Sequence, residues 1–210
     1  MTSLRDKVVF ITGGARGIGA EVARRLNAKG ARLVLTDLND AELTSLAAEL
    51  GEERVLTAVA DVRDLSAMQA AADRAVERFG GIDVVLANAG IASYGSVAQV
   101  DPDAFRRVLD INVLGVFHTV RATLPAVIER RGYVLIVSSL AAYAACPGLA
   151  PYNASKAASR CWPTRCDWKW PGTASRSARR TCPGSTPRWF ATPRTTCRPS
   201  IDCSPACPGR

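Results

Sequence analysis

Leucine, valine and methionine are absent from residues 159–210, and isoleucine occurs there once, as Ile201. The same segment holds all four tryptophans of the chain, six of its seven cysteines and eight of its twelve prolines. The aliphatic residues that fill a protein core are therefore almost confined to residues 1–158. The sequence divides into two segments of different composition, 1–158 and 159–210, and an ordinary hydrophobic core is excluded from the second.

Cysteine is nearly absent from residues 1–158, where Cys146 stands alone. A disulfide framework is thereby excluded from this segment, as is usual for proteins of a reducing compartment. The opening MTSLRDKVVFIT is apolar over too short a run for a signal peptide or a membrane-spanning helix. We therefore expect a soluble cytoplasmic protein with no membrane partner, in which Cys146 is a small apolar loop residue.

Excess charge is also absent from the first segment. Residues 1–158 contain 17 Lys and Arg against 17 Asp and Glu, whereas residues 159–210 contain 10 against 2. The net charge of +8 therefore lies in the second segment. A basic segment with tryptophans could bind single-stranded nucleic acid through phosphate contacts and base stacking. No recognised nucleic-acid-binding module accompanies it, so we do not expect this partner.

Short β-branched runs alternate with amphipathic stretches along residues 1–158. The runs KVVFIT, RLVLT, RVLTAVAD, IDVVLA and YVLIVSS predict buried strands over 7–12, 32–36, 54–61, 82–87 and 133–139. Apolar residues recur at helical spacing over 17–30, 40–50, 64–80 and 103–131. This order predicts an α/β fold, a Rossmann-type doubly wound parallel sheet with right-handed crossovers.

Glycines cluster between the first predicted strand and the first predicted helix. The stretch ITGGARGIGAEV places Gly13, Gly17 and Gly19 in a T-G-x-x-x-G-x-G pattern, with Arg16 and Ile18 among them. A tight turn here needs glycine, and a bare backbone lets a pyrophosphate reach the helix N-terminus. The position after a strand and before a helix favours a dinucleotide-binding turn over a purely structural one.

Asp37 lies at the end of the second predicted strand, eighteen residues after Gly19. A carboxylate there can accept hydrogen bonds from the adenosine ribose and would repel a 2′-phosphate, which favours NAD over NADP. Arg16 favours the opposite choice, because a guanidinium could pair with that phosphate. We expect NAD, and two alternatives stay open: NADP as the cofactor, and an Asp37 that only interacts with a helix dipole.

Six motifs follow one another in the order of a known family. They are TGGARGIG, ADV with Asp61 and Val62, ANAG with Asn88, Ala89 and Gly90, INV with Asn112, VSS with Ser139, and YNASK with Tyr152 and Lys156. From about residue 5 to residue 158 the chain resembles the short-chain dehydrogenase/reductase family, whose Ser-to-Tyr separation of thirteen selects Ser139 over Ser138. The resemblance implies an NAD(P)-dependent oxidoreductase that transfers hydride between nicotinamide and a secondary alcohol or ketone.

The resemblance also implies a role for each motif residue. Tyr152 would transfer a proton to or from the substrate oxygen, and Lys156, one helical turn away, would favour its phenolate and hold the nicotinamide ribose. Ser139 would hydrogen-bond the reacting oxygen, and Asn112 would hold a water near the lysine. Asn88, Ala89 and Gly90 would line the ribose side of the cofactor, and Asp61 with Val62 would line the adenine. Taken alone, a Tyr-x-x-x-Lys pair is common on structural helices, and His118 is expected to be an ordinary core or surface residue.

The resemblance ends soon after Lys156. Eight prolines exclude a long helix over residues 163–208, so strands one to five of the family's sheet are expected, with strands six and seven replaced by an irregular tail. Read one nucleotide out of frame, CWPTRCDWKWP becomes an amphipathic helix similar to the family's own continuation. We interpret residues 159–210 as the product of a frameshift near the codon for Ala158.

Other interpretations of the tail are weaker. Its six cysteines form no C-x-x-C pair and have no histidine among them, so no metal is expected. The stretch CPGST imitates a Pro-Gly motif of the family without a preceding strand. A tail of this composition is expected to be disordered.

Loss of two strands would have consequences for activity. It would leave a poorly active or inactive chain, at the limit a non-catalytic dinucleotide-binding remnant, and it makes the family's homo-oligomer doubtful for this chain. The remaining pocket segments, IASYGS and LAAYAACPGLAP, are mostly apolar. They favour a hydrophobic alcohol or ketone as substrate.

Overall fold

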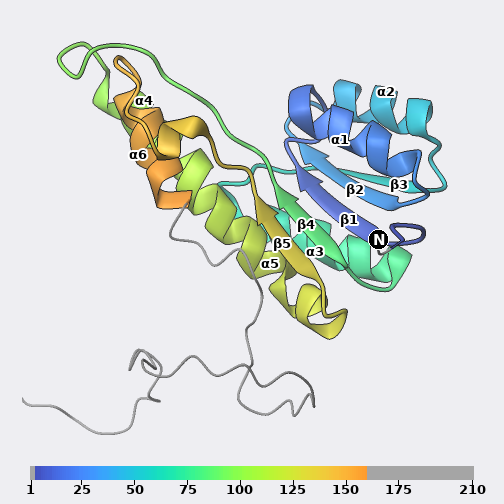
Figure 1. Cartoon of the computed structure of the whole chain (residues 1–210). Helices are drawn as coiled ribbons and strands as arrows, with labels where there is room; N and C mark the ends of the chain where they lie inside the picture. Colours follow the sequence, from blue (N-terminus) through green and yellow to red (C-terminus); the bar gives the residue numbers. More distant parts are fainter. Residues whose placement is uncertain (1–2, 160–210) are drawn as a thin grey trace, which may run out of the picture. The chain divides into compact units, whose positions relative to one another are not determined.

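The computed structural model describes residues 3–159, which form a parallel β-sheet with helices on both faces (Figure 1). The five strands are β1 (Val8–Thr12), β2 (Arg32–Asp37), β3 (Val55–Val59), β4 (Val84–Ala87) and β5 (Tyr133–Ile136). Their order is β3-β2-β1-β4-β5, and each neighbouring pair is parallel. The predicted doubly wound fold is confirmed over this range. The predictions for the tail, namely its frameshift origin, its disorder and the replacement of the sixth and seventh strands, lie outside the described residues, as does the nucleic-acid binding that was not expected of it.

The strands are mostly apolar because β1, β2 and β4 are largely buried on both of their faces. The α-helices are α1 (Gly17–Asn27), α2 (Asp40–Leu50), α3 (Leu65–Phe79), α4 (Pro102–Leu109), α5 (Gly115–Glu129) and α6 (Ala150–Ser159). Phe10 of β1 packs in one core with Met68 of α3, while its neighbour Ile11 packs in a second core with Leu43 of α2. Helices α1 and α2 thus cover one face of the sheet, and α3 and α5 cover the other (Figure 1).

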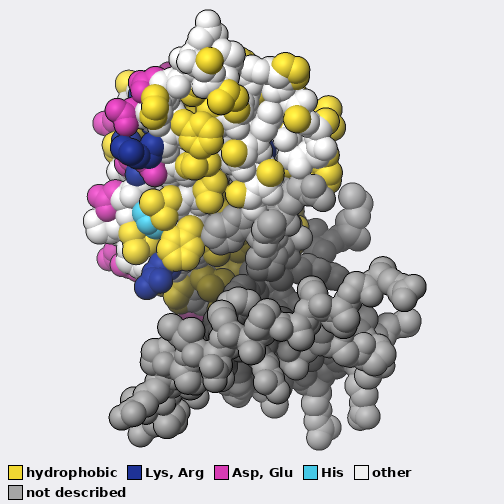
Figure 2. Space-filling model, turned by 90° about the vertical axis from the view of Figure 1, so that its left-hand side faces the viewer, with side chains coloured by type: hydrophobic (Ala, Val, Ile, Leu, Met, Phe, Trp, Pro, Cys, Tyr) yellow, Lys and Arg dark blue, Asp and Glu magenta, His cyan; other side chains and the backbone are white. Residues whose placement is uncertain are grey.

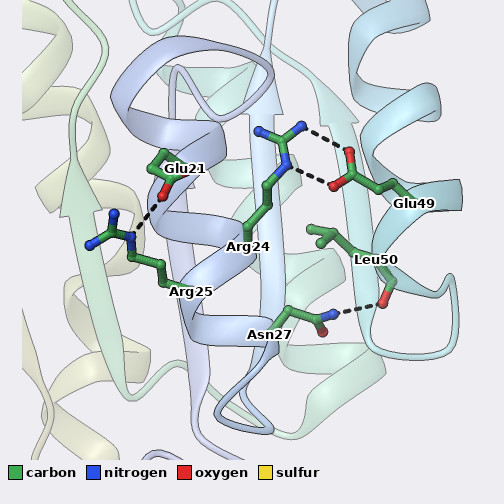
Figure 3. A network of polar contacts seen from close by, with 6 residues as sticks. All are labelled: Glu21, Arg24, Arg25, Asn27, Glu49 and Leu50. Atoms are coloured by element: carbon green, nitrogen blue, oxygen red, sulfur yellow. Dashed lines mark hydrogen bonds and ion pairs between the residues drawn. The ribbon is translucent and has the colours of Figure 1, made fainter.

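Polar contacts fasten α1 to α2 (Figure 3). Arg24 donates to both carboxylate oxygens of Glu49, at 2.7 and 2.8 Å, and Asn27 donates to the carbonyl of Leu50 at 2.9 Å. The hydrogen bonds from Arg24 lower the pKa of the Glu49 carboxyl. Both partners of this ion pair are exposed, so it aligns the two helices and adds little to stability.

The stretch predicted as one regular helix over 103–131 is continuous but contains a π turn, Asp110–Leu114, between α4 and α5. A π turn holds one residue more than an α turn, and such turns are frequent at functional sites. By length and composition Pro102–Glu129 could also cross a membrane, but 44% of its most apolar window is buried. Its buried face packs on α3, β4 and β5, which explains its apolar character.

Apolar side chains remain exposed at two places in this part of the chain. Strand β5 pairs with β4 on one side only within residues 3–159, and its Tyr133 and Leu135 are 40% and 43% exposed. Leu114, the last residue of the π turn, and Phe117 of α5 are 43% and 39% exposed. Figure 2 shows apolar side chains gathered around the histidine.

Candidate active site

A cleft of about 640 Å³ lies at the carboxyl ends of the strands, where the chain leaves β1 and β4 toward opposite faces of the sheet. Parallel α/β sheets bind ligands at such a switch point. The predicted residues that line the cleft are Gly13, Arg16, Ile18, Asp37, Asp61, Val62, Asn88, Ala89, Gly90, Tyr152 and Lys156. Gly17, Gly19, Asn112 and Ser139 were also predicted for the site and are not part of this lining.

The glycine turn has a backbone that other residues would strain. Gly13 and Gly17 have φ angles of 62° and 55°, in the left-handed region that favours glycine. A Cβ atom at Gly19 would collide with the carbonyl oxygen of Gly13, so α1 can begin this close to β1 only with glycine there. Helix α1 has no side-chain cap at Arg16. Its first N–H groups can therefore serve an anion beside the cleft.

Asp37 ends β2 and holds the glycine turn against it. Its Oδ2 accepts from the N–H of Ala15 at 3.1 Å, and its Oδ1 accepts from the N–H of Leu38 at 2.8 Å. Each carboxylate oxygen keeps a lone pair for a further donor in the cleft. Arg16 lines the same cleft and has no ion pair with any acid in the described part of the chain.

Thr12 organises the next part of the wall and was missed by the sequence analysis. Its hydroxyl accepts from the N–H groups of Asn88 and Ala89, both at 3.1 Å. The Asn88 amide in turn donates to the carbonyls of Thr12 and Gly13, both at 3.0 Å. These bonds tie the end of β4 to the end of β1. The available signal was the threonine of the T-G pattern itself, directly before the glycine turn.

Tyr152 and Lys156 lie one turn apart on α6 and line the same cleft. The Lys156 ammonium is 5.6 Å from the centroid of the Tyr152 ring, and its Nζ donates to the carbonyl of Val137 at 2.8 Å. Lys156 is only 7% exposed, and this burial lowers the pKa of its ammonium. The Lys156 ammonium therefore lies beside the Tyr152 ring with little solvent around it.

Asn112 lies in the π turn, and both its Oδ1 and its Nδ2 form hydrogen bonds. Its Oδ1 accepts from the N–H of Ile91 at 2.9 Å, and its Nδ2 donates to the Ile91 carbonyl at 2.8 Å and to the Ser155 hydroxyl at 2.9 Å. The Ser155 hydroxyl donates to the carbonyl of Tyr152 at 2.8 Å. Asn112 thus positions the loop after β4 and the helix that carries Tyr152. The water that the resemblance assigns to Asn112 stays a prediction.

Ser139 caps a short 3₁₀ helix, Leu140–Ala142, by accepting from the N–H of Ala141 at 3.2 Å. Its predicted contact with a reacting oxygen stays a prediction. The hydroxyl of its neighbour Ser138 lies 2.9 Å from that of Ser159 on α6. Cys146 lies in the following loop as a free thiol. Its backbone N–H donates to the Asn153 side chain, whose Nδ2 donates to the Cys146 carbonyl.

His118 positions Val62, a role that the sequence analysis did not foresee. Its Nδ1 lies 3.0 Å from the Val62 carbonyl oxygen, which can only accept, so Nδ1 carries the proton. Gly115, one turn earlier on α5, allows the close approach, because a Cβ there would lie 2.6 Å from Val62 Cγ2. Helix α5 therefore fixes the turn that contains Asp61 and Val62.

Several other cleft residues were not predicted. They are Leu38, Ala60, Arg63, Arg107, Ile111 and Val137. Most of these six are apolar, and their sequence carried no distinguishing signal, because only the tertiary arrangement brings them to the cleft. The lining also includes Ile91, Ala92, Tyr94 and Leu149, which belong to the two segments predicted to form the pocket, IASYGS and LAAYAACPGLAP. Over residues 3–159, no three His, Cys, Asp or Glu side chains gather as metal ligands would.

A family model described as short chain dehydrogenase matches residues 7–165. The chain belongs to this family. This short-chain dehydrogenase is 37% identical over 166 residues to dehydrogenase/reductase SDR family member 7B of Bos taurus. It is 38% identical over 159 residues to trans-4-hydroxycyclohexanecarboxylate dehydrogenase of Sinomonas cyclohexanicum. The two matches cover 75% and 72% of the chain but only 51% and 61% of the relatives.

Solved structures agree with this assignment. A short-chain dehydrogenase/reductase from Burkholderia phymatum in complex with NAD superposes with a TM-score of 0.73 at 30% identity, covering 76% of this chain and 58% of that one. An NAD⁺-bound xylitol dehydrogenase gives 0.72 at 32% identity, covering 75% and 62%. Both neighbours support a nicotinamide dinucleotide as the cofactor of this short-chain dehydrogenase.

Proposed function

We propose that this short-chain dehydrogenase binds NAD in preference to NADP and interconverts an apolar secondary alcohol and its ketone in the cytoplasm. The observation that carries the proposal is that Tyr152 and Lys156 share one cleft with the glycine turn and Asp37. The residues proposed to transfer the proton and the turn proposed to bind the dinucleotide thus line one cleft, although they come from opposite ends of the described chain.

The cleft residues fit the cofactor. The uncapped start of α1 suits a pyrophosphate, and the Asp37 carboxylate can accept from ribose hydroxyls while repelling a 2′-phosphate. When bound, the nicotinamide supplies or accepts the hydride. Tyr152 gives or takes the proton at the substrate oxygen, and the Lys156 ammonium stabilises the phenolate.

A second candidate is a dinucleotide-binding chain without useful catalysis. One observation favours it: Ser139 is not part of the cleft lining. We propose that the 210-residue chain turns over slowly or not at all. Sequencing the source DNA across the codons for Ser155 to Arg165 tests the frameshift interpretation, because an extra base there would restore the family pattern.

The experiment that separates the two candidates uses the purified full chain. NADH and NADPH are titrated while nicotinamide fluorescence is followed, and NAD-dependent oxidation of apolar secondary alcohols is then compared between the natural chain and Tyr152→Phe. Tight NADH binding with turnover that Tyr152→Phe abolishes supports the dehydrogenase. Binding without Tyr152-dependent turnover supports the remnant, and absence of binding contradicts both.

A further inference from the structure

A second cavity, of about 300 Å³, lies at the amino ends of the strands, at the opposite end of the sheet from the cleft. Its lining is Arg32, Glu53, Arg54, Arg78 and Phe79, none of which lines the cleft. Arg32 begins β2, Arg54 directly precedes β3, and Arg78 lies in the last turn of α3. Three arginines from three parts of the fold thus meet around one cavity.

The register of the sheet brings two of these arginines together. Arg32 and Arg54 lie one position before the first residue pair that joins β2 to β3, so they are neighbours on parallel strands. Side chains alternate between the two faces of a strand, and Val34 and Leu56, two positions further along, pack in the core with α3. Both arginines therefore point to the α3 face of the sheet, close to where that helix ends.

The Phe79 ring supports two of the guanidiniums. Phe79 is 8% exposed and packs in the core below the cavity. The guanidinium carbon of Arg32 is 5.9 Å from the ring centroid, and that of Arg78 is 5.4 Å from it. Cation–π contacts of this length attract a guanidinium to an aromatic ring. An immobile side chain thus holds positive charge from a strand and from a helix at the same place.

Backbone carbonyls hold the guanidiniums of Arg54 and Arg78. Arg54 Nη1 donates to the Gly30 carbonyl at 2.9 Å, and Arg78 Nη2 donates to the Glu52 carbonyl at 2.6 Å. These acceptors carry no net charge, so they position the two cations without neutralising them. A guanidinium has five N–H donors, and both arginines keep donors for a further acceptor.

Negative charge is scarce around the cavity. A single oxygen, Oδ1 of Asp6, lies 3.4 Å from Arg54 Nη1 and 3.7 Å from Arg32 Nη2, and so serves two guanidiniums at long distances. Neither Arg78 nor Glu53 forms an ion pair in the described part of the chain. Three cations therefore face two carboxylates, and the neighbouring like charges repel each other. An anion bound between the arginines would relieve this repulsion.

We propose that this cavity binds a small polyanion, whose phosphate or carboxylate groups pair with the guanidiniums of Arg32, Arg54 and Arg78. The planar fork of arginine matches both kinds of oxyanion. A volume of about 300 Å³ is at the lower limit for ligand pockets, which suits a molecule with two or three such groups. The site lies away from the cleft and does not depend on the proposed dehydrogenase function.

The test measures anion binding to the purified full chain. Inorganic pyrophosphate and citrate are titrated calorimetrically at an ionic strength fixed with sodium chloride, with and without NADH, which displaces pyrophosphate from the cofactor cleft. Arg32→Gln and Arg78→Gln each remove one positive charge, and Glu53→Gln removes the carboxylate that opposes an anion. Arg74→Gln, at an exposed arginine one turn earlier on α3 and outside the cavity lining, is the matched control.

We expect pyrophosphate binding that persists with NADH, weakens about tenfold in Arg32→Gln and in Arg78→Gln, and is unchanged in Arg74→Gln. Glu53→Gln should bind pyrophosphate more tightly, a gain that loss of folding cannot produce. Tighter binding of pyrophosphate than of citrate assigns the site to phosphate ligands, and the reverse assigns it to carboxylates. Absence of binding of both anions overturns the proposal, as does binding that NADH abolishes or that Arg32→Gln and Glu53→Gln leave unaltered.

Discussion

The Nδ2 group of Asn112 donates to the hydroxyl of Ser155 at 2.9 Å, joining the π turn directly to the helix that carries Tyr152. Both residues are nearly inaccessible to solvent, at 4% and 0% exposure. The contact spans 43 positions of sequence, so the position of α6 depends on a residue of another helix.

Replacing Asn112 by alanine removes this bond and both bonds to the Ile91 backbone. Because three hydrogen bonds are lost, two of them to the partly buried backbone of Ile91, we expect the free energy of unfolding to fall by about 3 kcal/mol. Ser155→Ala removes only one of the three bonds and should cost about 1 kcal/mol. Urea unfolding of both variants measures the difference, and equal losses would show that the Ile91 contacts contribute nothing.

Lys156 should make stability depend on pH. Burial lowers its pKa from the ordinary value of 10.5, so the unfolded chain holds this proton more tightly than the folded chain. Stability must then rise with pH between the lowered pKa and 10.5. We expect the melting temperature of the natural chain, minus that of Lys156→Met, to increase between about pH 8 and about pH 10. Lys29→Met, at an exposed lysine, should show no such trend, and a difference that does not vary with pH contradicts the expectation.

The two glycines that start α1 should respond differently to alanine. At Gly19 a Cβ would collide with the Gly13 carbonyl oxygen, so Gly19→Ala must displace the turn. We expect the free energy of unfolding to fall by about 3 kcal/mol and NADH binding to be lost. At Gly17 no atom lies within 4 Å of the added carbon, and only the positive φ opposes it, at about 1 kcal/mol. Thermal unfolding and NADH titration distinguish the two, and equal effects would mean that the collision is relieved elsewhere.

Asp37 should set the preference between the two dinucleotides. Asp37→Ala removes the acceptor for ribose hydroxyls and the repulsion of a 2′-phosphate, with Arg16 left on the same wall. We expect NADH affinity to fall about tenfold and NADPH affinity to rise. Asp40→Ala, at an exposed acid in the first turn of α2, is the control and should change neither. Parallel weakening of both cofactors would instead assign Asp37 to holding the turn at Ala15.

Much of the fold could be predicted because burial on two faces leaves a simple signature. Runs such as VVFIT are buried at every position, and their alternation with amphipathic stretches allows few topologies. The π turn could not be predicted, because nothing in the sequence from Pro102 to Glu129 departs from helical spacing. Within this turn Asn112 pairs with the Ile91 backbone, a tertiary contact that no local pattern specifies.

The site was predictable where a motif requires a particular residue. Glycine at position 13 is required by its φ angle, and the spacing of Tyr152 and Lys156 places both on one helix face. The contacts of Thr12, His118 and Arg63 could not be predicted, because threonine, histidine and arginine each make many kinds of contact in proteins. Their roles follow from which strand ends and helix faces meet, which a local pattern does not specify.

The π turn also allows one segment both to cover the sheet and to orient Asn112, two requirements that a regular helix would have to meet with the same geometry. A regular α-helix could follow the same course from α4 to α5 with one residue fewer, and it would cover the sheet equally well. What it would lose is the direction in which Asn112 points toward Ile91 and Ser155. One residue of this segment therefore serves the site and not the fold, and a single-residue deletion within 110–114 should give a chain that still folds but whose α6 has lost its anchor.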